Sequence, residues 1–303
     1  MIESNFSSAD ICYAHFCHRY YLRNHRELWR GRVLQKLLRR MDHWLHAFAE
    51  RFIYSRVPLF IVPSTGLKTQ IELEYPSTMG RVEVIHNPIE LRRLERPVTF
   101  DRETFRQALR IQRSDCALVF VALGHFERKG LAALLRGISE VDDSHLRLLV
   151  VGGRTGSIAS YSALADRLGL TGRIEFVGRQ DDVSPYLWAG DAFVLPSSYE
   201  TFSLAAYEAA AAGLPLIVTC TSGIEDIVRD GENGIVIRTD CSSIAEGIRK
   251  FLRLGPDARR RMGTSARESV QRYSTTSFVN AWRAVYCHDS KSDEVRFCKM
   301  EAR

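Results

Sequence analysis

Two glutamates mark the stretch PSSYETFSLAAYEAAAAGLP, residues 196–215. Glu200 stands in a polar segment after the apolar run AFVL, and Glu208 stands in an alanine-rich run that Gly213 and Pro215 end. This order predicts a strand, a loop and a helix. A helix N-terminus at the carboxyl end of a parallel strand offers free N–H groups to a phosphate, whereas carboxylates repel phosphate and accept hydrogen bonds from hydroxyl groups. The stretch therefore predicts a site for a ligand with both phosphate and hydroxyl groups.

The basic pair Arg128–Lys129 stands in HFERKG, after the apolar run ALVFVAL and before a helical pattern. Two cations there could neutralise the charge that builds up on a departing diphosphate, in place of a metal ion. A plainer structural interpretation also fits. Arg128 and Lys129 would then be surface cations of a first helical turn. Glu200 would be a helix cap, and Glu208 would be an exposed helix charge.

Two other features carry weaker signals. A lone histidine such as His15, in DICYAHF, is more often structural than catalytic, so the sequence leaves both roles open. Gly152 and Gly153 follow the apolar run LRLLVV but lack the G-x-G-x-x-G order of dinucleotide sites, and GGRTG does not run directly into a clear helical pattern. The glycines therefore predict a turn at a strand end and no hydride-transfer cofactor.

Short β-branched runs alternate with longer helical patterns from Ala117 onward. We predict strands at ALVFVAL, LRLLVVGG, RIEFVG, AFVLP, LPLIVT and near GIVIR. Such alternation is typical of parallel strands joined by crossover helices, and nearly all strand residues are apolar, as expected for a sheet covered on both faces. Residues from about 101 to 275 are therefore predicted to form a doubly wound α/β sheet, which would position the candidate residues at its strand ends.

The segment before this sheet has a less clear pattern. It contains the run LFIVPS, the helix-like GLKTQIELEY and the short strand RVEVIHNP, and proline and charge mark a linker at about 95–101. It is similar to the end of a second α/β domain. We therefore predict three parts: a partial N-terminal domain at 1–98, a Rossmann-like domain at 99–275, and a C-terminal helix and tail at 276–303.

A basic helix pattern runs through residues 23–56, with nine Arg or Lys against three Asp or Glu. Its helical spacing predicts one apolar stripe and one cationic face. The stripe consists of Leu34, Leu37, Leu38, Met41, Leu45, Phe48 and Phe52. One interpretation packs this stripe into a core and leaves the basic face in solvent. The other docks the helix onto anionic phospholipid, where each basic residue near the surface adds roughly 1 kcal/mol.

The composition, with 45% hydrophobic and 26% charged residues in 303, is that of a globular protein. A net charge of +6 favours an anionic partner, either a nucleotide phosphate, an anionic lipid or nucleic acid. The seven cysteines are scattered without zinc-site spacing, so no metal centre is predicted. We find no signal peptide and no membrane-spanning run, and therefore expect a cytoplasmic protein, soluble or peripheral on the inner face of a membrane.

Several blocks in the right order resemble the family-4 retaining glycosyltransferases of GT-B fold, the group 1 glycosyl transferases. Glu200 and Glu208 match their Glu-x7-Glu signature, and similarity extends through IVPSTGLKTQIELEYP, VEVIHNP, ALGHFERKGLAALLRGI, RIEFVGRQDDV and SGIEDIVRDGENGIVI. Many ordered blocks are far more specific than one. The resemblance implies an α/β fold with two Rossmann-like domains. The N-terminal one would be incomplete, because the strand and glycine-rich loop that usually open it are not visible before His15.

The resemblance also implies a role for each matching residue, with a UDP-, GDP- or ADP-sugar as donor and no metal or other cofactor. Arg128 and Lys129 would bind the diphosphate, and Glu200 would lie beside the donor sugar. Glu208 would hold the ribose, and His15 would face the cleft from the acceptor side. The other donor-binding residues would be Gly124, Arg179, Thr201, Phe202, Ser203 and Leu204. Family members usually have Gly-Phe-Gly at residues 201–203, where this chain has Thr-Phe-Ser.

The implied activity is transfer of a hexose-type sugar to an acceptor hydroxyl with retained anomeric configuration, the leaving phosphate helping to take the acceptor proton. We expect a glycan or lipid-linked acceptor of the cell envelope and no nucleic-acid partner. Two alternatives remain. One is a nucleotide-sugar-binding protein that no longer catalyses transfer. The other is a UDP-sugar epimerase of the same architecture, against which the Glu-x7-Glu loop argues.

Overall fold

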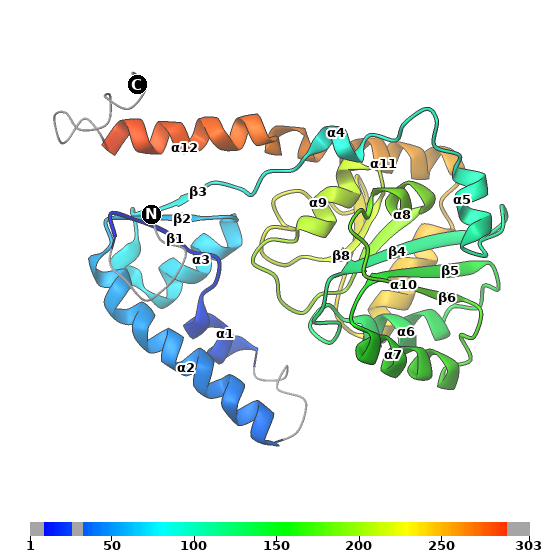
Figure 1. Ribbon diagram of the computed structural model, residues 1–303, viewed down its shortest axis with the longest axis horizontal. Coiled ribbons are helices and arrows are strands. Elements are labelled where there is room, and N and C mark those ends of the chain that lie inside the picture. The colour runs from blue at the N-terminus through cyan, green and yellow to red at the C-terminus, as the bar shows by residue number, and fades with distance from the viewer. Residues whose placement is uncertain (1–8, 26–32, 290–303) are drawn as a thin grey trace.

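Two parallel β-sheets, one small and one large, form two halves of the chain (Figure 1). The computed structural model describes residues 9–25 and 33–289. The N-terminal half contains β1 (Ile11–Tyr13), α1 (His18–Asn24), α2 (Val33–Arg56), β2 (Leu59–Val62), α3 (Thr65–Glu74), a 3-10 turn (Pro76–Thr78) and β3 (Val82–Val84). The C-terminal half contains α4 (Leu91–Leu94), α5 (Arg102–Ala108), β4 (Cys116–Ala122), α6 (Leu131–Ser139), β5 (Leu146–Gly152), α7 (Thr155–Arg167), β6 (Ile174–Gly178), α8 (Ser184–Ala189), β7 (Ala192–Leu195), α9 (Leu204–Ala211), β8 (Leu216–Thr219), β9 (Gly234–Ile237), α10 (Cys241–Leu252), α11 (Pro256–Val270) and a 3-10 turn (Gln271–Tyr273). The helix α12 (Thr275–Asp289) follows.

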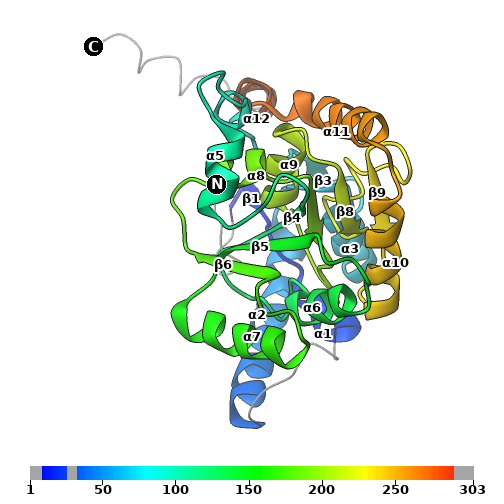
Figure 2. The ribbon, with the colours of Figure 1, turned by 90° about the vertical axis from the view of Figure 1, so that its right-hand side faces the viewer.

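The large sheet has the strand order β6-β5-β4-β7-β8-β9, with every neighbouring pair parallel. Every residue of β4, β7 and β8 is buried. Helices α6, α7 and α10 cover one face, and α8, α9 and α11 cover the other (Figures 1 and 2). The predicted doubly wound α/β sheet and its six strands are therefore confirmed.

The small sheet has the order β1-β2-β3 and is also parallel. Alternate residues of its strands enter two separate apolar clusters, as the period of two requires. Cys12 and Phe60 pack with Tyr54 of α2 and Leu67 of α3. Tyr13 and Ile61 pack instead with Trp282 of α12. Helices from both ends of the described chain therefore enclose this three-stranded sheet.

The chain crosses between the halves twice (Figure 1). The first crossing follows β3 and the second enters α12, and the two meet where Ile89 N–H donates to Tyr273 O at 2.8 Å. Ile89 and Ser274 form an isolated parallel bridge at this point. The predicted linker at 95–101 lies beyond it, and Asp101 ends the linker by capping α5. The boundary between 98 and 99 stays a prediction.

A buried arginine fastens α5 to the large sheet. Arg106 is 2% exposed, and its guanidinium donates to the carbonyl of Ala189 at 3.0 Å and to the carboxylate of Asp191 at 3.1 Å. It also donates to the carbonyls of Gln112 and Asp115. Because a buried guanidinium needs partners for its donors, this network fixes the start of β4 against α8.

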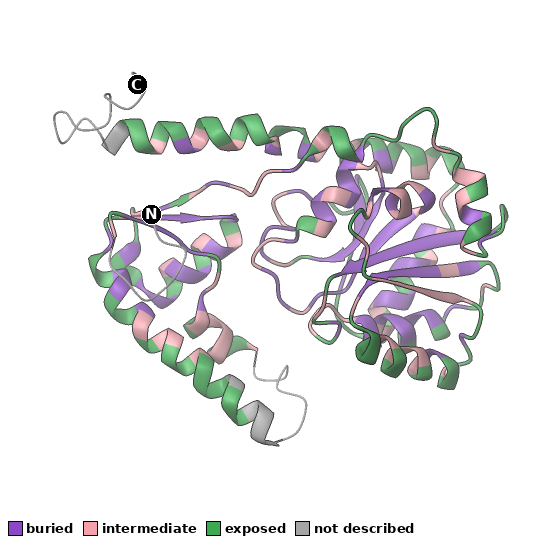
Figure 3. Cartoon of the chain, viewed as in Figure 1, coloured by how far each residue is buried: buried purple, intermediate pink, exposed green. Residues whose placement is uncertain are grey.

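The predicted basic helix at 23–56 corresponds to the end of α1 and to α2, and residues 26–32 lie outside the described ones. Along α2 the described stripe residues are 47–56% exposed, and Leu34 lies where no side chain is described. Figure 3 shows α2 exposed along much of its outer side. The interpretation that packs this stripe into a core is therefore wrong. Within the described residues, no helix combines the length of a bilayer span with sufficient apolar character to cross a membrane.

Candidate active site

The order of the strands in the large sheet brings two loops together. The chain builds β4, β5 and β6 outward in one direction and then returns to place β7, β8 and β9 on the other side of β4. Because β4 and β7 are parallel neighbours, the loops 123–130 and 196–203 leave the same edge of the sheet. Open α/β sheets bind ligands where the order of strands reverses in this way.

Lys129 and Glu200, one from each of these loops, form an ion pair. Lys129 Nζ lies 2.5 Å from Glu200 Oε1, and Ser197 Oγ donates to the same oxygen at 2.6 Å. The Lys129 side chain is 16% exposed and that of Glu200 is 5% exposed. Charge-assisted hydrogen bonds between shielded groups hold a narrow geometry, so the predicted cation and the first predicted carboxylate have fixed relative positions.

Backbone contacts fasten the two loops to each other. Arg128 O accepts from Ser198 N and from Ser198 Oγ, both at 2.9 Å. Gly130 has a φ of 79°, and a Cβ at this position would lie 2.1 Å from Pro196 O. Since a side chain would collide with that carbonyl and disfavour that φ, the turn before α6 requires glycine. The glycine of HFERKG thus allows Arg128 and Lys129 to approach the second loop.

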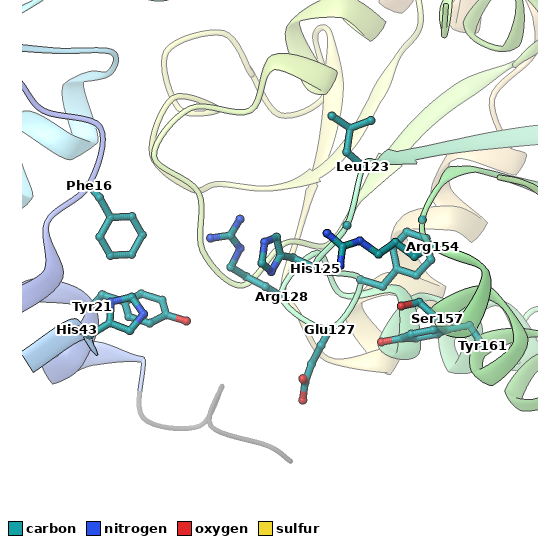
Figure 4. Close-up of a pocket in the computed structure, with 13 residues that line it drawn as sticks. Phe16, Tyr21, His43, Leu123, His125, Glu127, Arg128, Arg154, Ser157 and Tyr161 are labelled. Atoms are coloured by element: carbon teal, nitrogen blue, oxygen red, sulfur yellow. The ribbon is translucent and has the colours of Figure 1, made fainter. Parts of the chain in front are cut away.

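A cavity of about 840 Å³ lies beside these loops and between the two halves (Figure 4). The C-terminal half contributes Leu123, Gly124, His125, Phe126, Glu127, Arg128, Gly153, Arg154, Ser157 and Tyr161, and the N-terminal half contributes Phe16, Tyr21 and His43. Arg128 extends from its loop into the space between the halves (Figure 4), and its buried Nε has no hydrogen-bond partner. A guanidinium with an unsatisfied donor beside a cavity is suited to an anionic ligand.

Glu208, the second predicted carboxylate, lies on α9 and is half-buried. Burial raises the pKa of Glu208, with Asp182 adding to the rise and Arg93 of α4 opposing it. The carboxylate thus lies within electrostatic reach of Arg93 of α4, and Glu208 is not among the residues that line the cavity. A carboxylate with a raised pKa in a partly shielded place is suited to hydrogen bonds with hydroxyl groups.

The segment 201–204 connects the two glutamates. Thr201 O accepts a hydrogen bond from Ser64 Oγ of the N-terminal half at 2.7 Å. The Phe202 ring packs on Tyr207 with centroids 4.2 Å apart, and Ser203 precedes the first residue of α9, Leu204. Ser203 Oγ is buried without a partner. The segment therefore contacts both halves and leaves one hydroxyl available at the start of α9.

The remaining predicted residues lie farther from this centre. His15 follows β1, is exposed, and packs its ring on Tyr13 with centroids 4.1 Å apart; it is not among the residues that line the cavity. Arg179 follows β6 and is exposed. The roles proposed for both residues stay predictions.

The segment around Gly152 and Gly153, at the end of β5, differs from the sequence prediction in one respect. The two glycines do form a strand-end turn, with φ of 105° at Gly152 and 88° at Gly153. The segment then runs directly into α7 at Thr155, so the expectation that no clear helix follows is wrong. The residues at the start of α7 carry too weak an amphipathic pattern to reveal its first turns. As a result, Arg154 and Ser157 at the start of α7 line the cavity, and the sequence analysis missed both.

The interface between the halves also escaped sequence analysis. Gly66 N donates to Glu225 Oε1 at 2.7 Å, and Gln70 connects Ser222 with Tyr199 through its amide group. His86 Nε2 lies 3.1 Å from Asp226 Oδ2. These contacts join residues more than 100 positions apart. The blocks IVPSTGLKTQIELEYP, VEVIHNP and SGIEDIVRDGENGIVI of the family resemblance contain most of these residues, but the sequence did not predict contacts between them.

A histidine cluster lies behind the N-terminal wall of the cavity. His18 Nδ1 of α1 lies 2.9 Å from His43 Nδ1 of α2, and the His18 ring stacks on that of His46. Burial lowers the pKa of His18 to about 3, and burial also lowers the pKa of His25 and of His43.

Glu50 of α2 supports α1 from the same cluster. Its carboxylate accepts from His18 N at 2.7 Å, from Arg19 N at 3.2 Å and from Tyr75 OH at 2.8 Å. Burial raises the pKa of Glu50 to about 7 although these hydrogen bonds oppose the rise. Glu50 therefore satisfies the first N–H groups of α1 in place of a local cap. Among the described residues, this cluster and all other groups of His, Cys, Asp and Glu lack a set of three that could hold a metal ion.

Residues 117–253 match the family model of the glycosyl transferases group 1. The chain is 35% identical over 138 residues to the lipopolysaccharide core biosynthesis glycosyltransferase LpsE of Rhizobium meliloti, covering 45% of this chain and 40% of LpsE. It is 31% identical over 226 residues to a D-inositol 3-phosphate glycosyltransferase of a Mycobacterium species, covering 72% of this chain and 50% of that protein. The chain thus spans about half the length of the curated relatives it matches.

Solved structures share the fold. Sucrose-phosphate synthase from Thermosynechococcus elongatus superposes with a TM-score of 0.76 at 24% identity, covering 93% of this chain and 68% of that one. The two-sheet architecture predicted from the resemblance, the GT-B fold, is therefore confirmed.

Proposed function

Because the chain belongs to the group 1 glycosyl transferases through residues 117–253, we propose that it moves a hexose-type sugar from a nucleoside diphosphate sugar to an acceptor hydroxyl. The anomeric configuration would be retained. One observation carries the proposal: Lys129 and Glu200 meet at 2.5 Å where the strand order reverses, beside a cavity into which Arg128 extends. Two cations and a carboxylate in loops at one edge of the sheet suit a ligand that has both a diphosphate and hydroxyl groups.

Arg128 and Lys129 would stabilise the leaving group. When the bond between the anomeric carbon and the phosphate oxygen breaks, negative charge accumulates on the nucleoside diphosphate. Two fixed cations lower the energy of that charge without reorganising at the moment of reaction. Arg128 is suited to contact oxygens of both phosphate groups because its planar guanidinium offers several donors. One of these donors, Nε, has no partner within the protein.

Glu200 and Glu208 would orient the donor. The ion pair to Lys129 leaves Glu200 Oε2 available for a sugar hydroxyl, whereas Glu208 lies along α9, where it would accept from the ribose. Retention by double displacement would require a carboxylate nucleophile directly beneath the anomeric carbon. We instead propose front-face attack, in which the departing phosphate oxygen takes the acceptor proton and Glu200 forms no covalent intermediate.

The donor and acceptor are proposed from the relatives. HepE of Anabaena has been solved with UDP-glucose and shares the fold, with a TM-score of 0.75 at 16% identity, over 92% of this chain and 72% of HepE. A UDP-hexose is therefore the first donor to test. LpsE acts in lipopolysaccharide core biosynthesis, so we propose a cell-envelope glycan or glycolipid as the acceptor class.

Calorimetric titration tests the donor site. UDP-, GDP- and ADP-glucose are added separately to the full chain in the presence of excess EDTA, and we expect one of them to bind. Absence of binding for all three rules out an intact donor site. Binding that requires added Mg²⁺ would contradict the metal-independent mechanism.

Release of the nucleoside diphosphate, with water as the acceptor, tests catalysis without a known acceptor. Arg128→Ala and Lys129→Ala should each slow release by at least about 100-fold. Lys68→Ala, which removes a partly exposed cation paired with Glu72 on α3, is the control and should leave the rate unchanged. Arg128→Ala is the sharper variant, because Lys129→Ala also leaves the buried Glu200 without its partner. A wild-type chain that binds donor and never releases diphosphate would support the binding-protein alternative.

A further inference from the structure

The cavity between the halves has two walls of different chemistry (Figure 4). The C-terminal wall carries the cations Arg128 and Arg154. Among the described residues, the N-terminal wall consists of three rings: Phe16 before α1, Tyr21 in α1 and His43 in α2. We call these three half-buried residues the aromatic wall. A ligand in the cavity would therefore meet charge on one side and aromatic rings on the other.

The rings of the aromatic wall support one another. The Phe16 ring lies 5.2 Å from that of Tyr21 and stacks on that of His43 at 5.6 Å, and the last two lie 4.8 Å apart, all measured between centroids. Behind them, His18 Nδ1 lies 2.9 Å from His43 Nδ1, and Glu50 accepts from His18 N at 2.7 Å. Because rings held in this way lose little freedom when a ligand binds, the wall is suited to recognise a flat surface.

The aromatic wall is also uncharged. Burial lowers the pKa of His43 against the opposing charge of Asp42, and Arg128 on the other side of the cavity adds to the fall. The imidazole is therefore neutral at pH 7, and phenylalanine and tyrosine carry no charge there either. The diphosphate of the proposed donor thus has its partners on the C-terminal wall, and the aromatic wall is left for the second substrate.

Tyr199 connects the aromatic wall to the loop of Glu200. The Tyr199 ring meets those of Phe16 at 5.3 Å and Tyr21 at 4.9 Å, both edge to face. Tyr199 is 2% exposed, and the next residue in the chain is Glu200, which is bonded to Lys129. A ligand on the aromatic wall would therefore lie beside the segment proposed to hold the donor sugar, which is where an acceptor must lie.

The acceptor of the proposed function brings a hydroxyl group, and a lipid alcohol, a phenol or a sugar could each rest on rings. The C–H bonds on one face of a pyranose carry partial positive charge, which the negative face of an aromatic ring attracts. The hydroxyl groups of the sugar extend from its edge and can reach His125, Glu127 and Arg128 on the other wall. An alkyl chain or a phenol ring would leave those polar groups against apolar surface, which costs free energy.

We propose that the aromatic wall is a stacking platform for a pyranose ring of the acceptor. This role rests on the proposed function, whose acceptor it narrows to a hydroxyl group of a saccharide. The cavity, at about 840 Å³, lies within the size range of sites that enclose whole small molecules, so it has room for this ring beside the sugar of the donor. Phe16 and Tyr21 would then determine which alcohols the protein accepts.

Release of the nucleoside diphosphate in the presence of different alcohols tests the acceptor class. The full chain is given the donor that binds in the calorimetric titration together with one probe: the methyl glycoside of glucose, galactose, mannose or N-acetylglucosamine, or phenol, or octanol. At least one methyl glycoside should raise release about tenfold or more above the rate with water alone, because a bound hydroxyl is held close to the donor. Phenol and octanol should leave that rate as it is. The proposal is overturned if every glycoside fails to raise release, or if phenol or octanol raises it more than the glycosides do.

Substitutions in the aromatic wall test the platform itself. Phe16→Leu and Tyr21→Leu should each raise the KM for the active glycoside about tenfold, because leucine keeps apolar volume and removes the ring face. Phe16→Tyr keeps a ring and should hold this KM within about twofold of the wild type. Tyr286→Leu, which removes a ring that is 48% exposed on α12, is the matched control and should leave the KM unchanged. Unchanged KM in both leucine variants of the wall would overturn the platform.

Saturation-transfer NMR on the wild-type chain tests the same contact without turnover or a variant. Irradiation of the aromatic protons of the protein should saturate the protons on one face of the bound glycoside more than those on the other, because only one face lies on the rings. Equal transfer to both faces, or none, would contradict the platform. This measurement needs no donor, so failure of the platform is distinguished from failure of the proposed function, which would show as absent donor binding.

Discussion

The two halves of the molecule obtain their structure in different ways. The large sheet is built from strands buried on both faces, and its helices follow each strand within a short stretch of chain. The small sheet has three short strands, and residues far away in the sequence complete its surroundings: Trp282 covers one face, and Tyr199 and Glu225 contact its helices and loops. A half whose contacts are local can be predicted from its own pattern, whereas a half completed by distant residues cannot.

The same contrast predicts separate responses to mutation. Changes within the large sheet should alter the unfolding of the C-terminal half, and changes in α12 or in the histidine cluster should alter that of the N-terminal half. The variants below are ordered from the largest expected effect to the smallest.

Arg106→Ala should have the largest effect. It removes the buried guanidinium that donates to three carbonyls and to the Asp191 carboxylate, so the C-terminal half should lose about 3–5 kcal/mol of unfolding free energy. Calorimetric or denaturant unfolding measures the loss. Arg113→Ala, an exposed arginine shortly after α5, is the control and should change it little. Equal effects of the two variants would contradict the role assigned to Arg106.

Trp282→Ala should destabilise the N-terminal half by about 3 kcal/mol, because it removes a buried indole that packs edge to face on Tyr13. Fluorescence and circular dichroism during denaturation should show the small sheet unfolding earlier, with the midpoint of the C-terminal half unchanged. Val279→Ala, on a more exposed part of α12, is the matched control. If both halves shifted together, the two would unfold as one unit and the comparison above would not hold.

Gly66→Ala should weaken the contact between the halves and lower the free energy of unfolding by about 1–3 kcal/mol. A Cβ at Gly66 would lie 2.4 Å from Glu225 Oε1 and 2.5 Å from Ser222 Oγ, so the interface must shift to admit it. Gly156→Ala, where no atom lies within 4 Å of the added Cβ, is the control. Hydrogen exchange of the Gly66 amide should accelerate in the first variant relative to its neighbours in β2. Unchanged exchange and stability would show that the contact is easily rearranged.

Acid should destabilise the N-terminal half by up to about 1.4 kcal/mol per pH unit for each neutral histidine. The lowered pKa of His18, about 3, means that the folded half excludes a proton that the unfolded chain binds below about pH 6.5, so stability falls as pH falls from there. Glu50 acts oppositely: its pKa, raised to about 7, favours the folded half at low pH, and this contribution is lost as pH rises from about 4.5 to 7.

Two variants separate the contributions of His18 and Glu50 to the pH dependence of stability. His18→Gln should flatten the acid slope of the N-terminal transition between pH 5 and 6.5, approximately. Glu50→Gln should steepen it, because the opposing carboxyl is gone. The transition of the C-terminal half should keep its pH dependence in both variants. Identical slopes in all three proteins would show that solvent reaches His18 in the folded state.

Sequence analysis was sufficient for the large sheet and for part of the candidate site. The apolar runs identified all six strands. The sequence also placed Arg128, Lys129 and Glu200 in the loops after two strands, and these strands are neighbours, so the three residues lie at one edge of the sheet. Arg106 could not be predicted, since a buried arginine has the same pattern as a surface one until its carbonyl partners are placed. The α7 residues at the cavity were missed because their helix has little amphipathic character.

The direction of α2 shows a more general limit. A 3.6-residue period reveals that a helix has an apolar side, but it does not reveal which way that side points. Here Glu50 and His43 occupy the inner side, because the N–H groups of α1 require an acceptor and the neighbouring histidine is held neutral by burial. Polar residues thus bind the helix to its domain, and the apolar ones face outward.

The paired crossing between the halves limits how the molecule can move. Residue 89 and residue 274 are bonded side by side, and His86 adds a second contact to Asp226 close by. Twisting one connection alone would break this pairing, whereas bending both together would preserve it. The space between the halves should therefore open and close by rotation about a single axis through the two paired connections. Sliding of one half along the other would break the pairing and should be disfavoured.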